Sequence, residues 1–126
     1  MDDLKKEVHD FWNEASCGEQ LYLDGSDESG YLAQMHKRYE LEPFIESFAR
    51  FEEARDLDVL EIGVGLGADH QHFANAGARL TGIDLTARAV EHTRRRFELF
   101  GLRSDLRVAD AECLPFDEES FDVVYS

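Results

Sequence analysis

Three glycines alternate with apolar residues directly after a short apolar stretch, and an acid precedes them. The segment is Val59-Leu-Glu-Ile-Gly63-Val-Gly-Leu-Gly67, with Glu61 just before the first glycine. Glycine has no Cβ, so the backbone can turn sharply here and a ligand can approach it closely. A loop of this kind after a buried strand is typical of sites that bind a nucleotide-type cofactor.

Two further acids follow apolar stretches downstream. Asp84 ends the stretch Thr81-Gly-Ile-Asp84, and a carboxylate there can accept hydrogen bonds from both hydroxyls of a ribose. Asp110 could accept a hydrogen bond from an adenine amino group. It begins a short apolar segment, residues 110–116, whose backbone is restricted by Pro115, and such a segment could pack against a planar base. The alternatives are a strand-end or helix-capping role for Asp84 and a plain hydrophobic plug for residues 110–116.

The elements that must position these residues alternate along the chain. Apolar stretches predict strands at 57–62, 79–84, 105–109 and 121–125, and helical spacing predicts helices at 68–76 and 87–101. Thr86 is suited to cap the second helix. Such alternation indicates an α/β, Rossmann-like, doubly wound parallel sheet of order 3-2-1-4, in which ligands bind at the carboxyl ends of the strands.

N-terminal helices precede this sheet. Apolar spacing predicts helices at 3–15 and 31–51, the second broken near Pro43, with a polar loop at 17–30 between them. We therefore divide the chain into a helical lid or cap at 1–56 and a cofactor-binding half at 57–126. Core packing is the plainer interpretation of the aromatic stripes on these helices.

Charge and composition exclude several kinds of partner. The chain has 28 acidic and 13 basic residues in 126, a formal charge of −15, so we expect no nucleic acid partner. The basic run Arg94-Arg95-Arg96 is expected to be a solvated helix face. No stretch approaches the ~18 apolar residues of a membrane span.

The cysteines and histidines do not suggest a metal. Cys17 and Cys113 are far apart, which favours reduced thiols and a cytoplasmic protein. His70 and His72 lie too close along one helix to share a face, so we expect no metal site.

Four motifs occur in one order over residues 57–126. They are Glu61-Ile-Gly-Val-Gly-Leu-Gly67, Thr81-Gly-Ile-Asp-Leu-Thr86, Asp110-Ala-Glu-Cys-Leu-Pro-Phe116 and Phe121-Asp-Val-Val-Tyr-Ser126. Together they resemble the class I S-adenosylmethionine (SAM)-dependent methyltransferases, in particular the small-molecule, type 11-like branch that includes quinone-biosynthesis enzymes.

This resemblance implies a cofactor, a reaction and a set of site residues. The cofactor is SAM, and the reaction is an in-line displacement of its methyl group by a small-molecule acceptor, helped mainly by alignment and exclusion of water. The glycine loop would hold the methionine part with Glu61 nearby, and the later residues would hold the ribose and adenine; Tyr31 and Tyr39 are weaker candidates on the preceding helix. The implied cofactor-binding residues are Glu61, Gly63, Gly65, Gly67, Asp84, Leu85, Asp110 and Ala111.

Two alternatives remain open at the level of sequence. The loop with Ala68 also fits the pattern of a nicotinamide-dependent oxidoreductase, although Glu61 would then face a pyrophosphate. A non-catalytic, cofactor-binding remnant is the other alternative, because the resembled family continues for three more strands. We expect the chain to be truncated after its fourth strand and inactive by itself. The sequence indicates neither the acceptor nor the catalytic residues.

Overall fold

The sheet has the predicted topology. A computed structural model describes residues 27–117 and 120–126, so the predicted helix at 3–15 and most of the loop at 17–30 lie outside the described residues. One four-stranded sheet has the order β3-β2-β1-β4, with β1 at Asp58–Ile62, β2 at Arg79–Asp84, β3 at Asp105–Val108 and β4 at Val123–Tyr125. The predicted fold class is confirmed.

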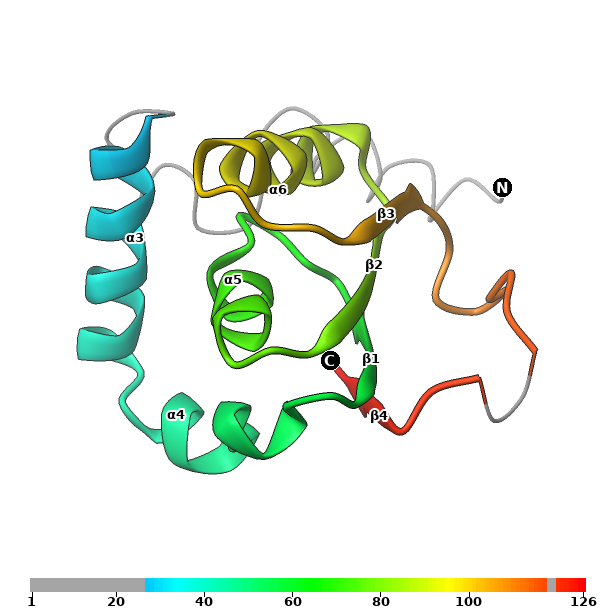
Figure 1. The fold of residues 1–126 in the computed structure, drawn as a ribbon. Coiled ribbons are helices and arrows are strands. Elements are labelled where there is room, and N and C mark those ends of the chain that lie inside the picture. The colour runs from blue at the N-terminus through cyan, green and yellow to red at the C-terminus, as the bar shows by residue number, and fades with distance from the viewer. Residues whose placement is uncertain (1–26, 118–119) are drawn as a thin grey trace.

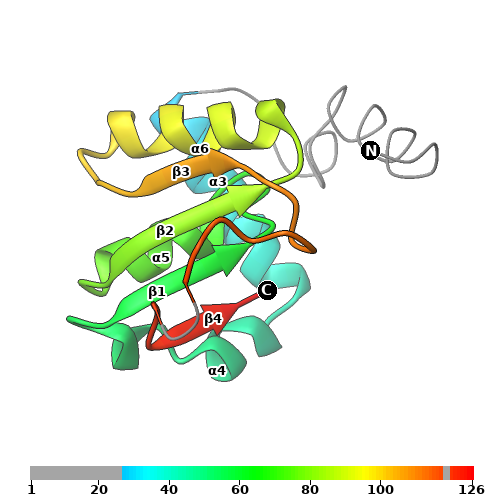
Figure 2. The ribbon, with the colours of Figure 1, turned by 90° about the vertical axis from the view of Figure 1, so that its right-hand side faces the viewer.

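All strand pairs are parallel, so their carboxyl ends meet at one edge. Leu60 of β1 pairs with Thr81 of β2 and with Val124 of β4, and Gly82 pairs with Leu106 of β3. Figure 2 shows the four arrowheads pointing the same way. The chain order reverses between β1 and β4, and the space beside such a reversal is where doubly wound sheets bind ligands.

Helices pack on one side of this sheet. The crossovers contain α5 at Ala68–Asn75 and α6 at Ala87–Leu99, and before β1 come α3 at Glu28–Leu41, α4 at Phe44–Ala49 and the 3-10 turn η1 at Phe51–Ala54. Figure 1 shows α3, α5 and α6 on the same side of the strands, with α3 outermost. The connection from β3 to β4 crosses on the other side (Figure 2).

Local signals explain where the helices begin and end. Asp27 caps α3 by accepting a hydrogen bond of 2.8 Å from the Gly30 amide. Thr86 caps α6, as predicted, by accepting a hydrogen bond of 3.2 Å from the Ala89 amide. The predicted break near Pro43 is confirmed, because α3 ends at Leu41 and α4 begins at Phe44.

The core lies between the sheet and the helices and includes residues from both sides of position 56. Burial of these apolar side chains is the main stabilising contribution to such a layer. Its buried members are Ile45, Phe51, Ala54, Val59, Phe73, Leu80 and Phe97.

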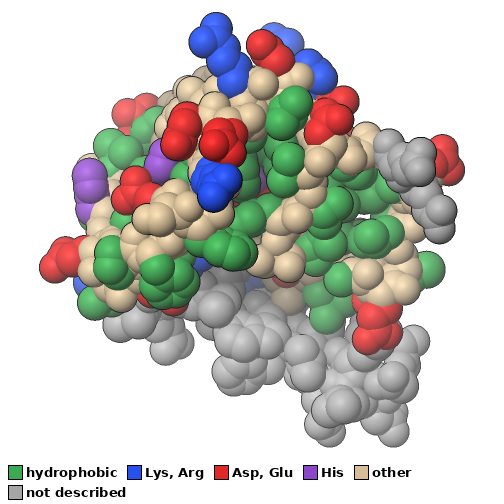
Figure 3. Space-filling model, turned by 90° about the horizontal axis from the view of Figure 1, so that it is seen from below, with side chains coloured by type: hydrophobic (Ala, Val, Ile, Leu, Met, Phe, Trp, Pro, Cys, Tyr) green, Lys and Arg blue, Asp and Glu red, His purple; other side chains and the backbone are tan. Residues whose placement is uncertain are grey.

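Part of the apolar surface remains exposed around α4. Leu41, Phe44 and Phe48 are 56, 65 and 74% exposed, and Figure 3, which views the molecule from the α4 side, shows hydrophobic side chains between acidic ones. Among the described helices, none is long and apolar enough to cross a bilayer.

Candidate functional site

Two adjoining cavities open at the carboxyl ends of the central strands. The first has a volume of about 160 Å³ and lies between α3 and the glycine loop; the second has a volume of about 310 Å³ and lies between β2 and the loop after β3. Gly63 lines both, so the two cavities meet at the glycine loop. The first is lined by Gln34, Arg38, Glu61, Gly63, Val64, Gly65, Leu66, Gly67, Ala68 and Asp69, and the second by Ile62, Gly63, Ile83, Asp84, Leu85, Ala109, Asp110, Ala111 and Glu112. All eight predicted cofactor residues therefore line one cavity or the other.

The three loop glycines are needed for different reasons. All have positive φ, at +79° for Gly63, +58° for Gly65 and +88° for Gly67, a region that L side chains rarely adopt. A Cβ on Gly63 or Gly65 would point into open space, whereas a Cβ on Gly67 would lie 2.9 Å from Oγ1 of Thr93 on α6. The first two leave room for a ligand, and the third allows α6 to pack closely.

Asp84 holds the loop as well as lining the second cavity. Its Oδ2 accepts a hydrogen bond of 3.1 Å from the Gly65 amide, and its Oδ1 accepts bonds of 3.1 and 3.3 Å from the Thr86 amide and hydroxyl. A carboxylate offers about four acceptor positions. Asp84 thus combines the predicted strand-end position with contacts at the start of α6, the alternative role considered above, and its bond to the Gly65 amide is a contact that the sequence did not indicate.

The loop after β3 forms the outer wall of the second cavity. Oδ1 of Asp110 accepts a hydrogen bond of 2.9 Å from the Glu112 amide, which fixes the turn that presents Ala111. The apolar segment after it is more exposed than expected for a hydrophobic plug, with Leu114 40% exposed. Packing of this segment against a base stays a prediction.

Glu61 belongs to a buried hydrogen-bond chain. Its Oε1 lies 3.1 Å from Nδ1 of His70, and Nε2 of His70 lies 2.7 Å from Oγ of Ser104, which donates to the Leu80 carbonyl at 3.3 Å. Burial raises the pKa of Glu61 well above its ordinary value and lowers the pKa of His70 to about 3, which favours both neutral forms. With Ser104 donating to Leu80, its oxygen accepts from His70 Nε2–H, and Nδ1 accepts from protonated Glu61. In the sequence His70 was considered only as a metal ligand.

Arg38 and Asp69 are site residues that the sequence analysis missed. Asp69, in the first turn of α5, accepts hydrogen bonds of 3.2 and 2.9 Å from Nε and Nη2 of Arg38, and 2.9 Å from each of the Tyr39 and Tyr125 hydroxyls. Burial alone would lower the pKa of Arg38, but Asp69, together with Glu42 and Tyr125, outweighs burial and raises that pKa. This cluster attaches α3 and β4 to the glycine-loop helix. Tyr39, a weaker candidate from the sequence, acts here as part of it.

The prediction that the arginine run forms a solvated helix face is wrong for Arg96. Arg94 and Arg95 are exposed, but Arg96 is fully buried between α3, α5 and α6, beside the fully buried Tyr31. The missed signal is its spacing, because Arg96 lies three residues after Thr93 and so falls on the buried stripe of α6. Neither Tyr31 nor Arg96 lines the cavities, although Arg96 contacts residues that do.

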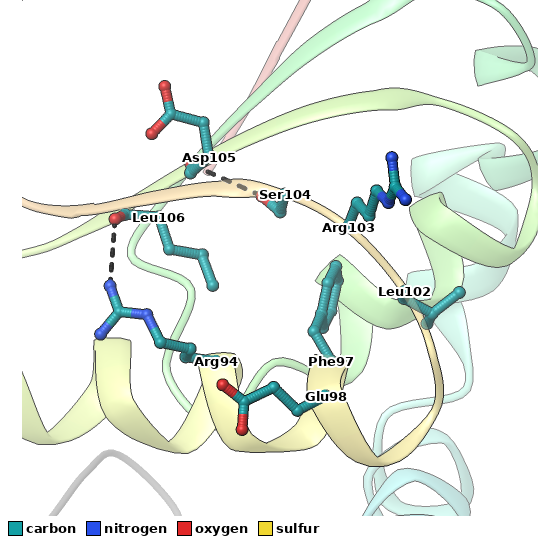
Figure 4. A pocket seen from close by; sticks show the side chains of 8 residues that line it. All are labelled: Arg94, Phe97, Glu98, Leu102, Arg103, Ser104, Asp105 and Leu106. Carbon is teal, nitrogen blue, oxygen red and sulfur yellow. Dashed lines mark hydrogen bonds between the residues drawn. The ribbon is translucent and has the colours of Figure 1, made fainter.

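A larger hollow, of about 480 Å³, lies elsewhere. It is formed by the second half of α6 and the chain leading into β3, at the amino ends of the strands, and Figure 4 shows Arg94 at its edge, with Nη2 donating to the Leu106 carbonyl at 3.4 Å. Its rim has charges of both signs and it contains none of the glycine loop. In doubly wound sheets ligands bind at the opposite end, so this hollow is not the cofactor site.

The fold and site define a doubly wound cofactor-binding domain, with a glycine loop and two strand-end acids around adjoining cavities at the switch point. Comparison with known proteins identifies the family. The family model described as "Methyltransferase domain" matches residues 59–126, more than half of the chain, and the chain belongs to this family. The methyltransferase family predicted from the four motifs is therefore confirmed.

Relatives and solved structures agree with this assignment. The ubiquinone biosynthesis O-methyltransferase of Methylocella silvestris is 38% identical over 68 residues, covering 54% of this chain and 27% of the relative. The phthiotriol/phenolphthiotriol dimycocerosates methyltransferase of Mycobacterium tuberculosis is 41% identical over 68 residues, covering 52% of this chain and 24% of the relative. The chain thus spans about a quarter of the length of these curated relatives.

The fold extends beyond the matched segment. The magnesium protoporphyrin IX methyltransferase of Synechocystis PCC 6803, solved with bound SAM, has a TM-score of 0.69 at 20% identity over 98% of this chain and 61% of the other. At this identity the likeness concerns the fold, and it includes the helices that precede β1.

Proposed function

We propose that the paired cavities bind SAM and that the protein transfers the cofactor's methyl group to a small-molecule acceptor. The main support is the joining of a polar cavity and a less polar cavity at Gly63, beside the switch point of the sheet. A cofactor with a charged amino-acid end and a less polar nucleoside end would need one polar and one less polar cavity side by side. The relatives named above are methyltransferases, which supports the same reaction class.

The polar cavity fits the methionine end. Its lining offers a carboxyl oxygen of Glu61 as a hydrogen-bond acceptor for an ammonium group, and donors on α3, Gln34 and Arg38, for a carboxylate. Ala68 and Asp69, in the first turn of α5, line the same cavity, and a helix N-terminus favours an anion. Gly63 and Gly65 leave the space in which the chain of the ligand would lie.

The second cavity fits the nucleoside end. Asp84 has about one acceptor position beyond the three hydrogen bonds it already receives, so two ribose hydroxyls would have to replace one of these. Ile83 and Leu85 provide apolar contacts for the adenine, with Asp110 and the Ala111 amide at its edge. We propose the eight residues predicted from the sequence in these roles.

Bound SAM would supply an electrophilic methyl group on a sulfonium. The residues of this chain would bind the cofactor's two ends and hold it at the switch point, so alignment rather than a strong base is their contribution. A chain of 126 residues with 28 acids and 13 basic residues favours a small molecule over nucleic acid as acceptor. The lone cysteines support a cytoplasmic location.

Calorimetric titration with S-adenosylhomocysteine and, separately, with NADH tests the cofactor. We expect the protein to bind S-adenosylhomocysteine and not to bind NADH. A protein that binds NADH but not S-adenosylhomocysteine would refute the proposal. Gly65→Ala should abolish binding by placing a Cβ in the cavity, where φ is +58° and the space is open. Gly101→Ala is the matched control, because Gly101 has a φ of +66° and open space but lies outside both cavities.

A further inference from the structure

Arg96 is a buried cation held by uncharged groups. Its Nε donates to Oε1 of Gln71, its Nη1 donates to Oε1 of Gln34 at 2.6 Å and to the Leu66 carbonyl at 3.1 Å, and its Nη2 donates to the Tyr31 carbonyl at 2.8 Å. The guanidinium also lies over the Tyr31 ring, 5.1 Å from its centroid. Within the described part of the chain it contacts no carboxylate. Burial lowers its pKa to about 10, so it remains protonated at neutral pH.

This arrangement fixes the orientation of the Gln34 amide. A guanidinium can only donate hydrogen bonds, so the group of Gln34 that faces Arg96 must be the amide oxygen. The amide NH₂ is then turned away from Arg96. Gln34 is 3% exposed and lines the first cavity, and its NH₂ has no hydrogen-bond partner among the residues that the structure describes. A buried amide NH₂ without a partner is costly, and a ligand acceptor in the cavity would satisfy it.

The charges around the cavity favour an anion at this point. Asp69 is neutralised by the ion pair with Arg38, whose Nη2 lies 2.9 Å from its Oδ2. Glu61 is contributed by β1, not by α3; it is hydrogen-bonded to His70, and burial favours its neutral form. Arg96 lies directly behind Gln34, and no acid of residues 27–117 or 120–126 pairs with it. The α3 side of the cavity is therefore a donor surface backed by positive charge.

We propose that Arg96 is a positioning residue, which acts through Gln34 to make the α3 wall of the cavity specific for the carboxylate of the cofactor's methionine end. The inference rests on the proposed function. Arg96 does not touch the ligand; it holds the Gln34 oxygen, so that the NH₂ is available only to the ligand. A carboxylate at the same place would accept that hydrogen bond and gain from the charge behind it.

Two isosteric substitutions separate this role from a structural one. Gln34→Glu and Gln71→Glu each give Arg96 a carboxylate partner, so both variants should keep or raise the thermal unfolding midpoint. Only Gln34→Glu replaces the NH₂ that faces the cavity with an acceptor oxygen. Its affinity for S-adenosylhomocysteine should fall by about 10- to 100-fold, because one hydrogen bond to a charged group is lost. Gln71→Glu lies outside the cavity and pairs the Arg96 charge but keeps the Gln34 NH₂, so its affinity should fall less than that of Gln34→Glu, by no more than about 3-fold.

The ligand 5′-methylthioadenosine, which lacks the amino-acid part, distinguishes the possible failures. Its affinity should be the same in the wild type and in both variants. Equal affinity of the two folded variants for S-adenosylhomocysteine would overturn the role of Arg96 and Gln34 while leaving the proposed cofactor intact. Wild-type protein that binds neither ligand would instead overturn the proposed function, and with it the inference.

Discussion

Replacing Asp69 with asparagine should detach the α3 wall of the site. Asp69 is 4% exposed and accepts four hydrogen bonds, two from Arg38 and one each from Tyr39 and Tyr125. Asparagine has nearly the same shape but only one acceptor oxygen, so its NH₂ would face donors. Arg38 would lose its buried counter-charge and keep only the more exposed Glu42, 3.3 Å away. Removing one partner of a buried ion pair costs about 3–5 kcal/mol. Because the Arg38 side chain is 29% exposed, we expect about 3 kcal/mol.

The free energy of unfolding in urea, compared between wild type and variant, measures this cost. Asp105→Asn is the matched control, since Asp105 forms a comparable pair with Arg107 at 2.8 Å whose side chains are 49 and 47% exposed. Water and salt screen an exposed pair, so this control should lower stability far less than Asp69→Asn does. Similar small losses in both variants would refute the view that Asp69 joins α3 and β4 to the glycine-loop helix.

Three further predictions concern the residues around the loop. Gly82→Ala should lower stability by about 1–3 kcal/mol, because the new Cβ would lie 2.7 Å from Val64 Cγ1 and 2.8 Å from His70 Cε1; unchanged denaturation would contradict this packing. The folded-state pKa of His70, about 3, lies below its unfolded value of 6.5, so its stability contribution is complete above pH 6.5 and is lost as the pH falls toward 3. The difference in unfolding free energy between wild type and His70→Gln should therefore change by about 1.4 kcal/mol per pH unit over that window, and a flat difference would rule out a buried neutral imidazole. Asp84→Ala should weaken S-adenosylhomocysteine binding by about 1–3 kcal/mol in calorimetry, and no loss would remove Asp84 from the ribose site.

The sequence was sufficient for the sheet and for bringing the proposed cofactor residues to one edge of it. Strand periodicity, the Thr86 cap and the break near Pro43 are local signals, and alternating strands and helices restrict the topology strongly. Asp84 at the end of β2 lies next to the glycine loop because parallel strands end at the same edge of the sheet. The topology alone therefore predicts that these two lie together. The prediction that Arg96 is exposed was wrong, because it relied on the basic composition of the run and not on the position of Arg96 along the helix.

The remaining contacts depend on tertiary packing. Glu61, His70 and Ser104 come from three separate elements, and nothing in their local sequence indicates that they form one hydrogen-bond chain. Asp69 likewise has partners on α3 and β4, far away along the sequence. Such contacts follow from how α5 packs between the sheet and α3, which side-chain spacing within one element does not determine.

The central claim is that one SAM-type ligand occupies both cavities across Gly63. Backbone amide chemical shifts, followed while S-adenosylhomocysteine is added, test this most directly. We predict saturable changes at Gly63 and Gly65, at Ala68 beside the methionine end, and at Leu85 and Ala111 beside the nucleoside end. Changes confined to the hollow between α6 and β3, or no saturable change at the glycine loop, would contradict the claim.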